Sequence, residues 1–111
     1  MSIEDAVADI KAQLEKDRDR LTGFSGVFQI VITGTTFGTF HVGVEDNRPV
    51  AALGDVDNPD CTIELTDQDF ERLALKQVTP MGLFLTGRAR VQGNRKLAFD
   101  FYARVGKSAF G

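Results

Sequence analysis

Few side chains in this 111-residue sequence could do chemistry, and His41 is the first to test because it is the only histidine. A general base must face the substrate and needs a carboxylate to orient it. The alternating pattern of a strand puts His41 on the face opposite Phe40 and Val42. We therefore expect His41 to face solvent and to have no catalytic role.

Cys61 is the only cysteine, so an internal disulfide and a four-cysteine zinc site are both excluded. A reactive thiol needs exposure and a nearby cation or helix N-terminus to lower its pKa. Alternation instead places Cys61 on the same face as Ile63 and Leu65. Because free cysteine packs well as a small apolar group, we expect Cys61 to be a buried core residue.

The acidic loop from Asp55 to Asp60 invites a calcium hypothesis. An EF-hand loop beginning at Asp55 would need a ligand at its fifth position, glycine at its sixth and glutamate at its twelfth. Those positions hold Pro59, Asp60 and Thr66. The loop therefore fits a turn closed by Pro59 better than a metal site. With one histidine and no nucleophile elbow, a serine triad is also unsupported, so we expect no catalytic residue, metal or cofactor.

Length and composition indicate one globular domain over residues 1–111, with 42% hydrophobic and 26% charged residues. The formal charge of −3 argues against a nucleic-acid partner and gives no support to a strongly anionic membrane surface. The N-terminus lacks the basic segment and apolar run of a secretory signal. No apolar stretch approaches the roughly 18 residues of a membrane span. We expect a cytoplasmic location, with any membrane contact transient.

Hydrophobic periodicity predicts a helix and three strands in the first half of the chain. A helix is predicted from Ser2 to Leu21, because apolar residues from Ile3 to Leu21 fall at helical spacing. Ser2 and Asp5 are placed as a capping box, and Gly23 is the expected stop. Alternation then predicts three strands, at residues 28–33, 39–44 and 50–53. Because only one face of the first two strands is apolar, one face of the sheet should be buried.

The second half is predicted to mix two strands with three helical segments. The strands fall at residues 61–65 and 88–92. A helix capped by Thr66 runs from Asp67 to Gln77, a second helical turn starts at Thr79-Pro80, and a last helix runs from Asn94 to about Arg104. The helical crossover between the two strands would permit them to pair in parallel.

Three motifs in this half resemble the sterol carrier protein type-2 family of lipid-binding domains. Residues Asp60 to Phe70 match the family's polar–Asp–apolar strand that leads into Thr/Ser-Asp-x-Asp/Glu-Phe. Pro80 and Phe84 match its Pro-x-x-x-Phe helical turn. Residues Gly87 to Asn94 match its Gly-basic-apolar-basic-apolar-x-Gly-Asn strand. With the preceding hairpin, the resemblance covers about Gly23 to Tyr102.

The resemblance implies an α+β fold in which helices cover one face of a five-stranded mixed sheet and leave an apolar tunnel between the layers. It implies non-catalytic binding and carriage of lipids, whether fatty acids, fatty acyl-CoA or sterols. The residues on the inner faces would line the tunnel and bind the lipid: Phe28, Ile30, Phe40, Val42, Phe70, Leu73, Met81, Phe84, Leu97 and Phe101. The tail is shorter than in longer family members, so closure of the tunnel would fall to Val105 and Phe110.

Two alternatives stay open at this point. A small enzyme could act on a hydrophobic substrate in a cone-shaped α+β pocket, but it would need an ionisable pair facing that pocket, and alternation puts no carboxylate or histidine there. The apolar faces could also be filled entirely by packing or dimerisation, since apolar residues at regular spacing usually form a core. Among lipids, we favour fatty acids and acyl thioesters over sterols, because such a domain need not come from a sterol-making organism.

Overall fold

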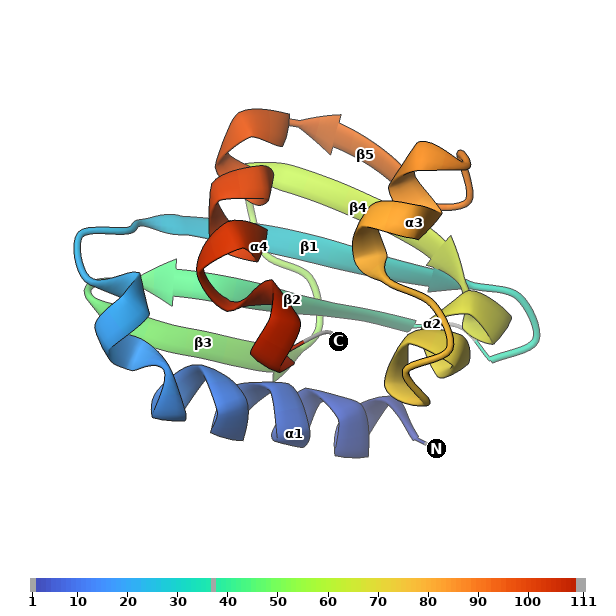
Figure 1. Ribbon diagram of the computed structural model, residues 1–111, viewed down its shortest axis with the longest axis horizontal. Coiled ribbons are helices and arrows are strands. Elements are labelled where there is room, and N and C mark those ends of the chain that lie inside the picture. The colour runs from blue at the N-terminus through green and yellow to red at the C-terminus, as the bar shows by residue number, and fades with distance from the viewer. Residues whose placement is uncertain (1, 37, 110–111) are drawn as a thin grey trace.

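One mixed sheet organises the protein in the computed structural model, which describes residues 2–36 and 38–109. Its strands lie in the order β3-β2-β1-β4-β5, and helices cover one of its faces (Figure 1). The strands are β1 (Gly26–Thr33), β2 (Gly38–Glu45), β3 (Arg48–Leu53), β4 (Cys61–Thr66) and β5 (Arg90–Gly93). The predicted α+β class and five-stranded mixed sheet are confirmed.

The parallel pair in this sheet is β1 with β4, while β1 with β2 and β2 with β3 are antiparallel. Strand β5 also pairs antiparallel with β4, placing Ile63 opposite Val91. The parallel pairing that the sequence pattern permitted for β4 and β5 is therefore wrong. Helices α2 and α3 connect β4 to β5 and lie at the end of the sheet where β4 stops. Strand β5 therefore starts at that end and runs in the direction opposite to β4 (Figure 1).

The helices are α1 (Ile3–Lys16), the 3-10 helix η1 (Arg18–Leu21), α2 (Asp67–Ala74), α3 (Pro80–Leu85) and α4 (Arg95–Ala109). The hydroxyl of Ser2 accepts a 3.1 Å hydrogen bond from the Asp5 amide, as the capping box predicted. The single helix predicted up to Leu21 is wrong, because α1 ends at Lys16. Residues 15–20 contain no apolar side chain to hold them on the core, and the tighter η1 turn buries Leu21 instead.

Two other helix ends also differ from the prediction. Helix α2 stops at Ala74, short of Gln77, because Lys76 adopts the left-handed conformation with a φ of 62°. Helix α4 continues past Arg104 to Ala109 and includes Gly106, which is buried. Packing of α4 against the core therefore outweighs the low helix propensity of glycine.

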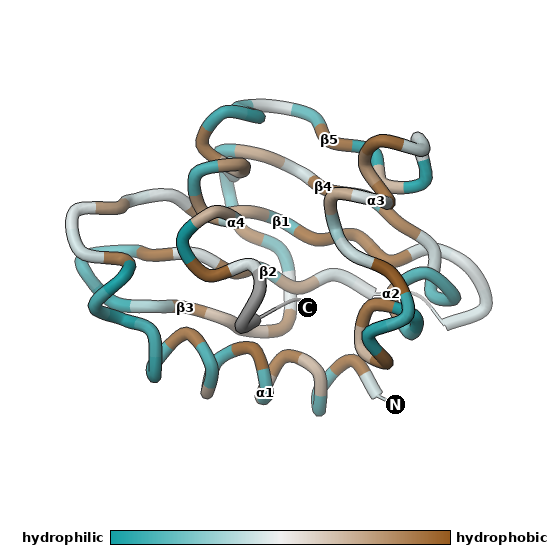
Figure 2. The backbone as a smooth tube through the Cα atoms, in the orientation of Figure 1, coloured by the Kyte–Doolittle hydropathy of each residue, from teal (hydrophilic) through white to brown (hydrophobic). Residues whose placement is uncertain are grey.

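The core lies between the sheet and the helices. Phe28, Phe40 and Val42 are each 1% exposed, so the predicted alternation in β1 and β2 is correct. Hydropathy along the backbone shows the same arrangement, with apolar turns of α1 toward the sheet and polar turns away from it (Figure 2). Cys61 is also in this core, as predicted, and its burial raises the pKa of the thiol.

Candidate functional site

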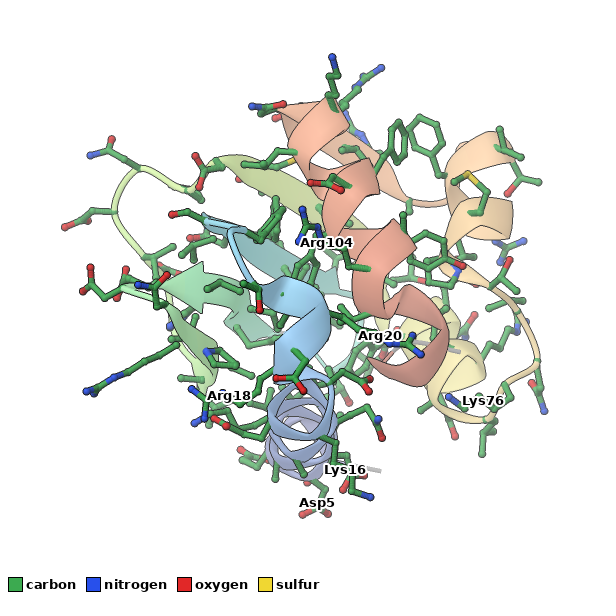
Figure 3. All side chains as sticks on the ribbon, turned by 60° about the vertical axis from the view of Figure 1, so that its left-hand side comes forward. Asp5, Lys16, Arg18, Arg20, Lys76 and Arg104 are labelled. Atoms are coloured by element: carbon green, nitrogen blue, oxygen red, sulfur yellow. The ribbon has the colours of Figure 1, made fainter. Side chains whose placement is uncertain are left out.

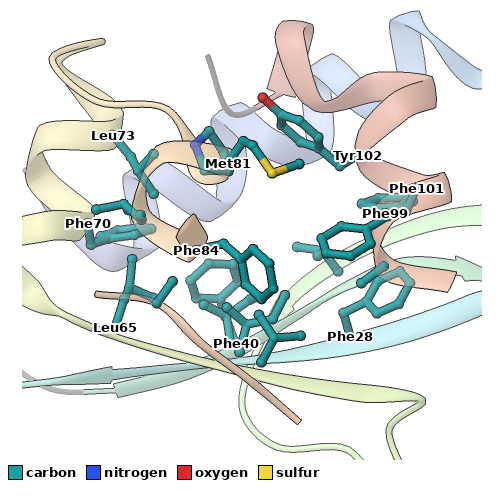
Figure 4. Close-up of a pocket in the computed structure, with 18 residues that line it drawn as sticks. Phe28, Phe40, Leu65, Phe70, Leu73, Met81, Phe84, Phe99, Phe101 and Tyr102 are labelled. Atoms are coloured by element: carbon teal, nitrogen blue, oxygen red, sulfur yellow. The ribbon is translucent and has the colours of Figure 1, made fainter. Parts of the chain in front are cut away.

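An apolar cavity of about 130 Å³ lies between the sheet and helices α2, α3 and α4 (Figure 4). The sheet wall of the cavity consists of Phe28, Ile30, Phe40, Val42, Ile63, Leu65 and Val91. The helical wall consists of Phe70, Leu73, Pro80, Met81, Leu83, Phe84, Ala98, Phe99, Phe101 and Tyr102. Ala89, just before β5, joins the two walls. A continuous tunnel, as the resemblance implied, stays a prediction.

The structure brings nine of the ten predicted lining residues together around this cavity. The tenth, Leu97, lies outside the lining, because α4 directs it onto the start of β1, where it occupies the space beside Gly26 that a Cβ atom would need. Val105, which was expected to help close the tunnel, is buried in the core away from the lining. Phe110 lies outside the described residues.

Sequence reasoning left several lining residues out of the predicted site. Strand alternation had already assigned Ile63, Leu65 and Val91 to inner faces, so it could have predicted that these three residues line the cavity. Phe99 and Tyr102 gave no such signal, because each falls one position beyond the expected apolar stripe of α4. Because α4 lies over the sheet and also contacts α3 through Phe99 and Phe84, a wider face of this helix reaches the cavity.

Two aromatic side chains meet on the side of the cavity between α3 and α4. Phe99 lines the cavity and is also 38% exposed, and its ring makes an edge contact with Phe84, with ring centroids 5.2 Å apart (Figure 4). The guanidinium of Arg95 lies 5.9 Å from the centre of the Phe84 ring. We call this contact between Phe84 and the exposed Phe99 the mouth of the cavity.

The conspicuous polar residues of the motifs hold the helical wall in place. Asp69 of α2 is only 2% exposed, and its carboxylate accepts hydrogen bonds of 3.0 Å from Arg72 and, through two nitrogens, from Arg88. The hydrogen bonds from Arg88 are the main reason that the pKa of Asp69 lies below its usual value. Because Arg88 lies two residues before β5, this two-point pair holds both ends of the segment that contains α3.

Other motif residues serve as helix caps and as links to the sheet. The side chains of Thr66, Thr79 and Asn94 accept hydrogen bonds from amides at the starts of α2, α3 and α4. The carboxylate of Asp60 accepts a 2.8 Å hydrogen bond from the Val27 amide, so the acidic loop ends in a structural contact. These contacts assign the motif to positioning the cavity walls.

The residues tested first for chemistry lie away from the cavity. His41 follows the lining residue Phe40 on the opposite sheet face, as predicted, and its Nδ1 donates a hydrogen bond of 3.0 Å to the Gly54 carbonyl. Among the described lining residues, Tyr102 alone has an ionisable side chain. In residues 2–36 and 38–109, no cluster of three histidine, cysteine or acidic side chains could hold a metal ion, and no helix is long and apolar enough to cross a membrane.

The fold and cavity define an α+β domain in which helices and one face of a mixed sheet enclose an apolar cavity. The chain belongs to the SCP-2 sterol transfer family, whose model matches residues 7–103. A search of curated proteins gave no match. The family assignment supports lipid binding or transfer as the general function, as the resemblance of the motifs implied.

Solved structures share the fold at low sequence identity. The palmitated sterol carrier protein 2-like 2 of Aedes aegypti aligns with a TM-score of 0.74 and 23% identity, covering 95% of each chain. The apo sterol carrier protein 2 of Yarrowia lipolytica aligns with a TM-score of 0.68 and 15% identity, covering 96% of this chain and 89% of its own. The sec-alkylsulfatase Pisa1 of Pseudomonas sp. aligns with a TM-score of 0.63 and 15% identity, covering 79% of this chain but only 14% of the sulfatase.

Proposed function

We propose that residues 1–111 form one domain that binds and carries a lipid with a long acyl chain, a fatty acid or fatty acyl thioester, in the cavity. The observation that carries this proposal is the composition of the described lining, in which every side chain is apolar except for the hydroxyl of Tyr102. Such a lining favours burial of a hydrocarbon chain. It offers no acid–base pair of the kind that turnover of the bound lipid would need.

Burial alone can supply the affinity. Each methylene removed from water contributes ~0.8 kcal/mol, so about twelve methylenes contribute roughly 10 kcal/mol. Association costs on the order of 4–15 kcal/mol before net affinity appears. At the lower end of that cost about 6 kcal/mol remains, so a fatty chain can bind without a charged anchor with a dissociation constant of roughly 40 μM.

The cavity has to widen for a whole acyl chain to enter. Sites for small molecules usually measure roughly 300–1,000 Å³, whereas this cavity measures about 130 Å³. The helical wall is the side that could yield, since α2 and α3 span only eight and six residues and isolated helices of that length are marginal in water. Met81 in this wall adds an adaptable side chain. We propose that the chain enters at the mouth as α3 moves away from α4.

Proteins with the same fold support an acyl chain as part of the ligand, but they do not identify the lipid. The Aedes aegypti protein is palmitated, which supports an acyl chain as the ligand class. The sulfatase carries this fold as a small part of an enzyme, so the enzyme alternative calls for a direct test. The described lining gives that alternative no support.

The test is native mass spectrometry of the protein purified from cells, followed by titration with a fluorescent fatty acid. We expect a co-purifying lipid and saturable binding that an unlabelled fatty acid competes away more strongly than a sterol. Incubation with a fatty acyl thioester should leave the ester intact. A protein that retains no lipid and binds no fatty acid would contradict the proposal, and catalysed hydrolysis would favour the enzyme.

A further inference from the structure

Tyr102 lines the cavity with a polar group to which burial of a hydrocarbon chain gives no role. This residue lies on α4 and is half-buried, and its hydroxyl is the polar side-chain group of the described lining. No described residue forms a hydrogen bond with that hydroxyl. Figure 4 shows the hydroxyl directed away from the sheet. Tyr102 therefore presents an apolar ring to the cavity and a free donor at the outer edge of the cavity.

The ring of Tyr102 occupies space that its own helix leaves open. Gly106 lies about one turn further along α4 and is buried. Because side chains on a helix tilt toward its N-terminus, a side chain at this position would point at the ring, and its Cβ atom would collide with the ring carbons Cδ1 and Cε1. Glycine inside a helix is unfavourable, and the placement of the Tyr102 ring gives a reason for it here.

The surroundings of this hydroxyl suit an uncharged carbonyl better than a carboxylate. The described lining contains no cationic side chain, so an ionised head group would lose water without gaining a counter-charge. Arg104, two residues further along α4, lies at η1 instead (Figure 3), where its guanidinium donates hydrogen bonds to the carbonyls of Arg20 and Thr22. Arg95 lies seven residues before Tyr102 on the same helix, roughly 10 Å away along the axis.

We propose that Tyr102 determines the orientation and the head-group class of the bound lipid, which is an acyl chain ending in an uncharged ester or thioester. The hydroxyl donates a hydrogen bond to the acyl carbonyl oxygen at the outer edge of the cavity. The hydrocarbon chain extends from there toward Phe28 and Phe40 on the sheet wall. Apolar burial supplies most of the affinity, and the hydroxyl distinguishes lipids of equal chain length. This inference rests on the proposed function, because it assigns the polar end of the same ligand.

The first measurement compares the wild type with Tyr102→Phe, which keeps the ring and removes the hydroxyl. Methyl decanoate has a carbonyl and decyl fluoride has none, and each is used to displace a bound fluorescent fatty acid. We expect Tyr102→Phe to weaken binding of the ester roughly fivefold, the effect of one neutral hydrogen bond, and to leave binding of the fluoride within about twofold of the wild type. The wild type should also bind the ester more tightly than ionised decanoate.

The matched control moves the hydroxyl by less than one turn of α4. Phe99 also lines the cavity and is 38% exposed, so Phe99→Tyr adds a hydroxyl that can reach water. The double variant Tyr102→Phe with Phe99→Tyr has the same composition as the wild type. We expect it to bind the ester as weakly as Tyr102→Phe alone. Recovery of wild-type affinity would show that the position of the hydroxyl is unimportant and would overturn the assignment to Tyr102.

The composition of the chain provides a second readout. Tyr102 is the only tyrosine and the chain has no tryptophan, so the intrinsic fluorescence of the wild type reports on this ring alone. A hydrogen bond from a phenol to a carbonyl oxygen lowers the emission of the phenol. Saturation with methyl decanoate should therefore lower the emission of the wild type more than saturation with decyl fluoride does.

Three further outcomes would overturn this inference. They are equal effects of Tyr102→Phe on the ester and the fluoride, tighter binding of ionised decanoate than of its ester, and equal emission with the two uncharged ligands. Each of them leaves the proposed function intact, because the wild type still binds the fluorescent fatty acid. Absence of that binding in the wild type would instead contradict the proposed function, and this inference with it.

Discussion

The sheet wall and the helical wall of the cavity are held in place by different forces. Strand β1 is hydrogen-bonded on both sides, to β2 and β4, and its inward residue Phe28 is almost fully buried. The helical wall consists largely of two short helices whose lining residues, apart from the buried Leu83, are only half-buried, including Leu73 and Phe84. A few tertiary contacts, above all Asp69 with Arg88, hold those helices. We infer that the sheet wall determines the shape of the cavity and the helical wall controls access to it.

The largest effect should come from the sheet wall. Phe40 is 1% exposed and its ring contacts Phe70 of α2, with centroids 5.7 Å apart. Phe40→Ala should lower the free energy of unfolding by about 4 kcal/mol, because it removes a buried ring and leaves a void. Phe84→Ala, in the half-buried helical wall, should cost less than about half of that. Urea unfolding of both variants measures the comparison, and equal costs would remove the distinction between the walls.

A charge in the helical wall should act on binding more than on stability. Leu73 lines the cavity but is half-buried, so Leu73→Arg can fold with its guanidinium reaching water, whereas a buried unpaired charge would be costly. We expect fatty-acid affinity to fall at least roughly tenfold, since the lost burial amounts to about two methylenes. Leu75→Arg, at an exposed position just beyond α2, is the control. Unchanged binding by folded Leu73→Arg would show that this wall does not contact the ligand.

Removing the contacts that Asp69 makes with Arg72 and Arg88 should have an intermediate effect on stability. Asp69→Asn removes the charge that both Arg72 and Arg88 contact, and it should cost about 2 kcal/mol in urea unfolding, as expected for hydrogen bonds to a charged group. Glu71→Gln, an exposed position on the same helix, should have no measurable effect. If the helical wall controls access, Asp69→Asn should also speed fatty-acid release in stopped flow. An unchanged release rate would show that the contacts of Asp69 stabilise the helical wall without controlling access to the cavity.

The same carboxylate predicts a dependence of stability on pH. Because the pKa of Asp69 is lower in the folded protein than in the unfolded chain, its stabilising effect is fully present above the unfolded value of about 3.9. It is lost as the pH falls through the lower folded value. The wild type should therefore lose more stability on acidification than Asp69→Asn does. Parallel stability curves for the two proteins below about pH 4 would contradict this assignment.

The smallest effect is expected outside both walls. His41 donates to the Gly54 carbonyl on the face away from the cavity. His41→Gln should leave fatty-acid affinity unchanged across about pH 5 to 8, the range in which histidine changes its charge. A pH dependence that disappears in this variant would place His41 in the site and would favour the enzyme alternative.

Much of the sheet wall was predictable because strand periodicity is a local property. Side chains alternate between faces, so Phe28, Phe40 and Val42 could be assigned to the interior from their spacing alone. Helix starts were predictable for a similar reason, since Thr66 and Thr79 bond to amides only three residues away. The helical wall was less predictable. The rotation of α4 about its axis sent Leu97 to Gly26 and brought Phe99 to the cavity.

The sequence by itself therefore determined which residues are apolar on which face, where the helices begin and which family motif the chain carries. Only the tertiary structure decided that β5 runs antiparallel to β4, that the buried Asp69 pairs with the exposed Arg88 nineteen residues away, and that the facing apolar surfaces leave a cavity of about 130 Å³. The physical reason is that hydrogen bonds and side-chain direction are set between near neighbours. Empty volume and long-range pairing depend on how whole elements pack against one another.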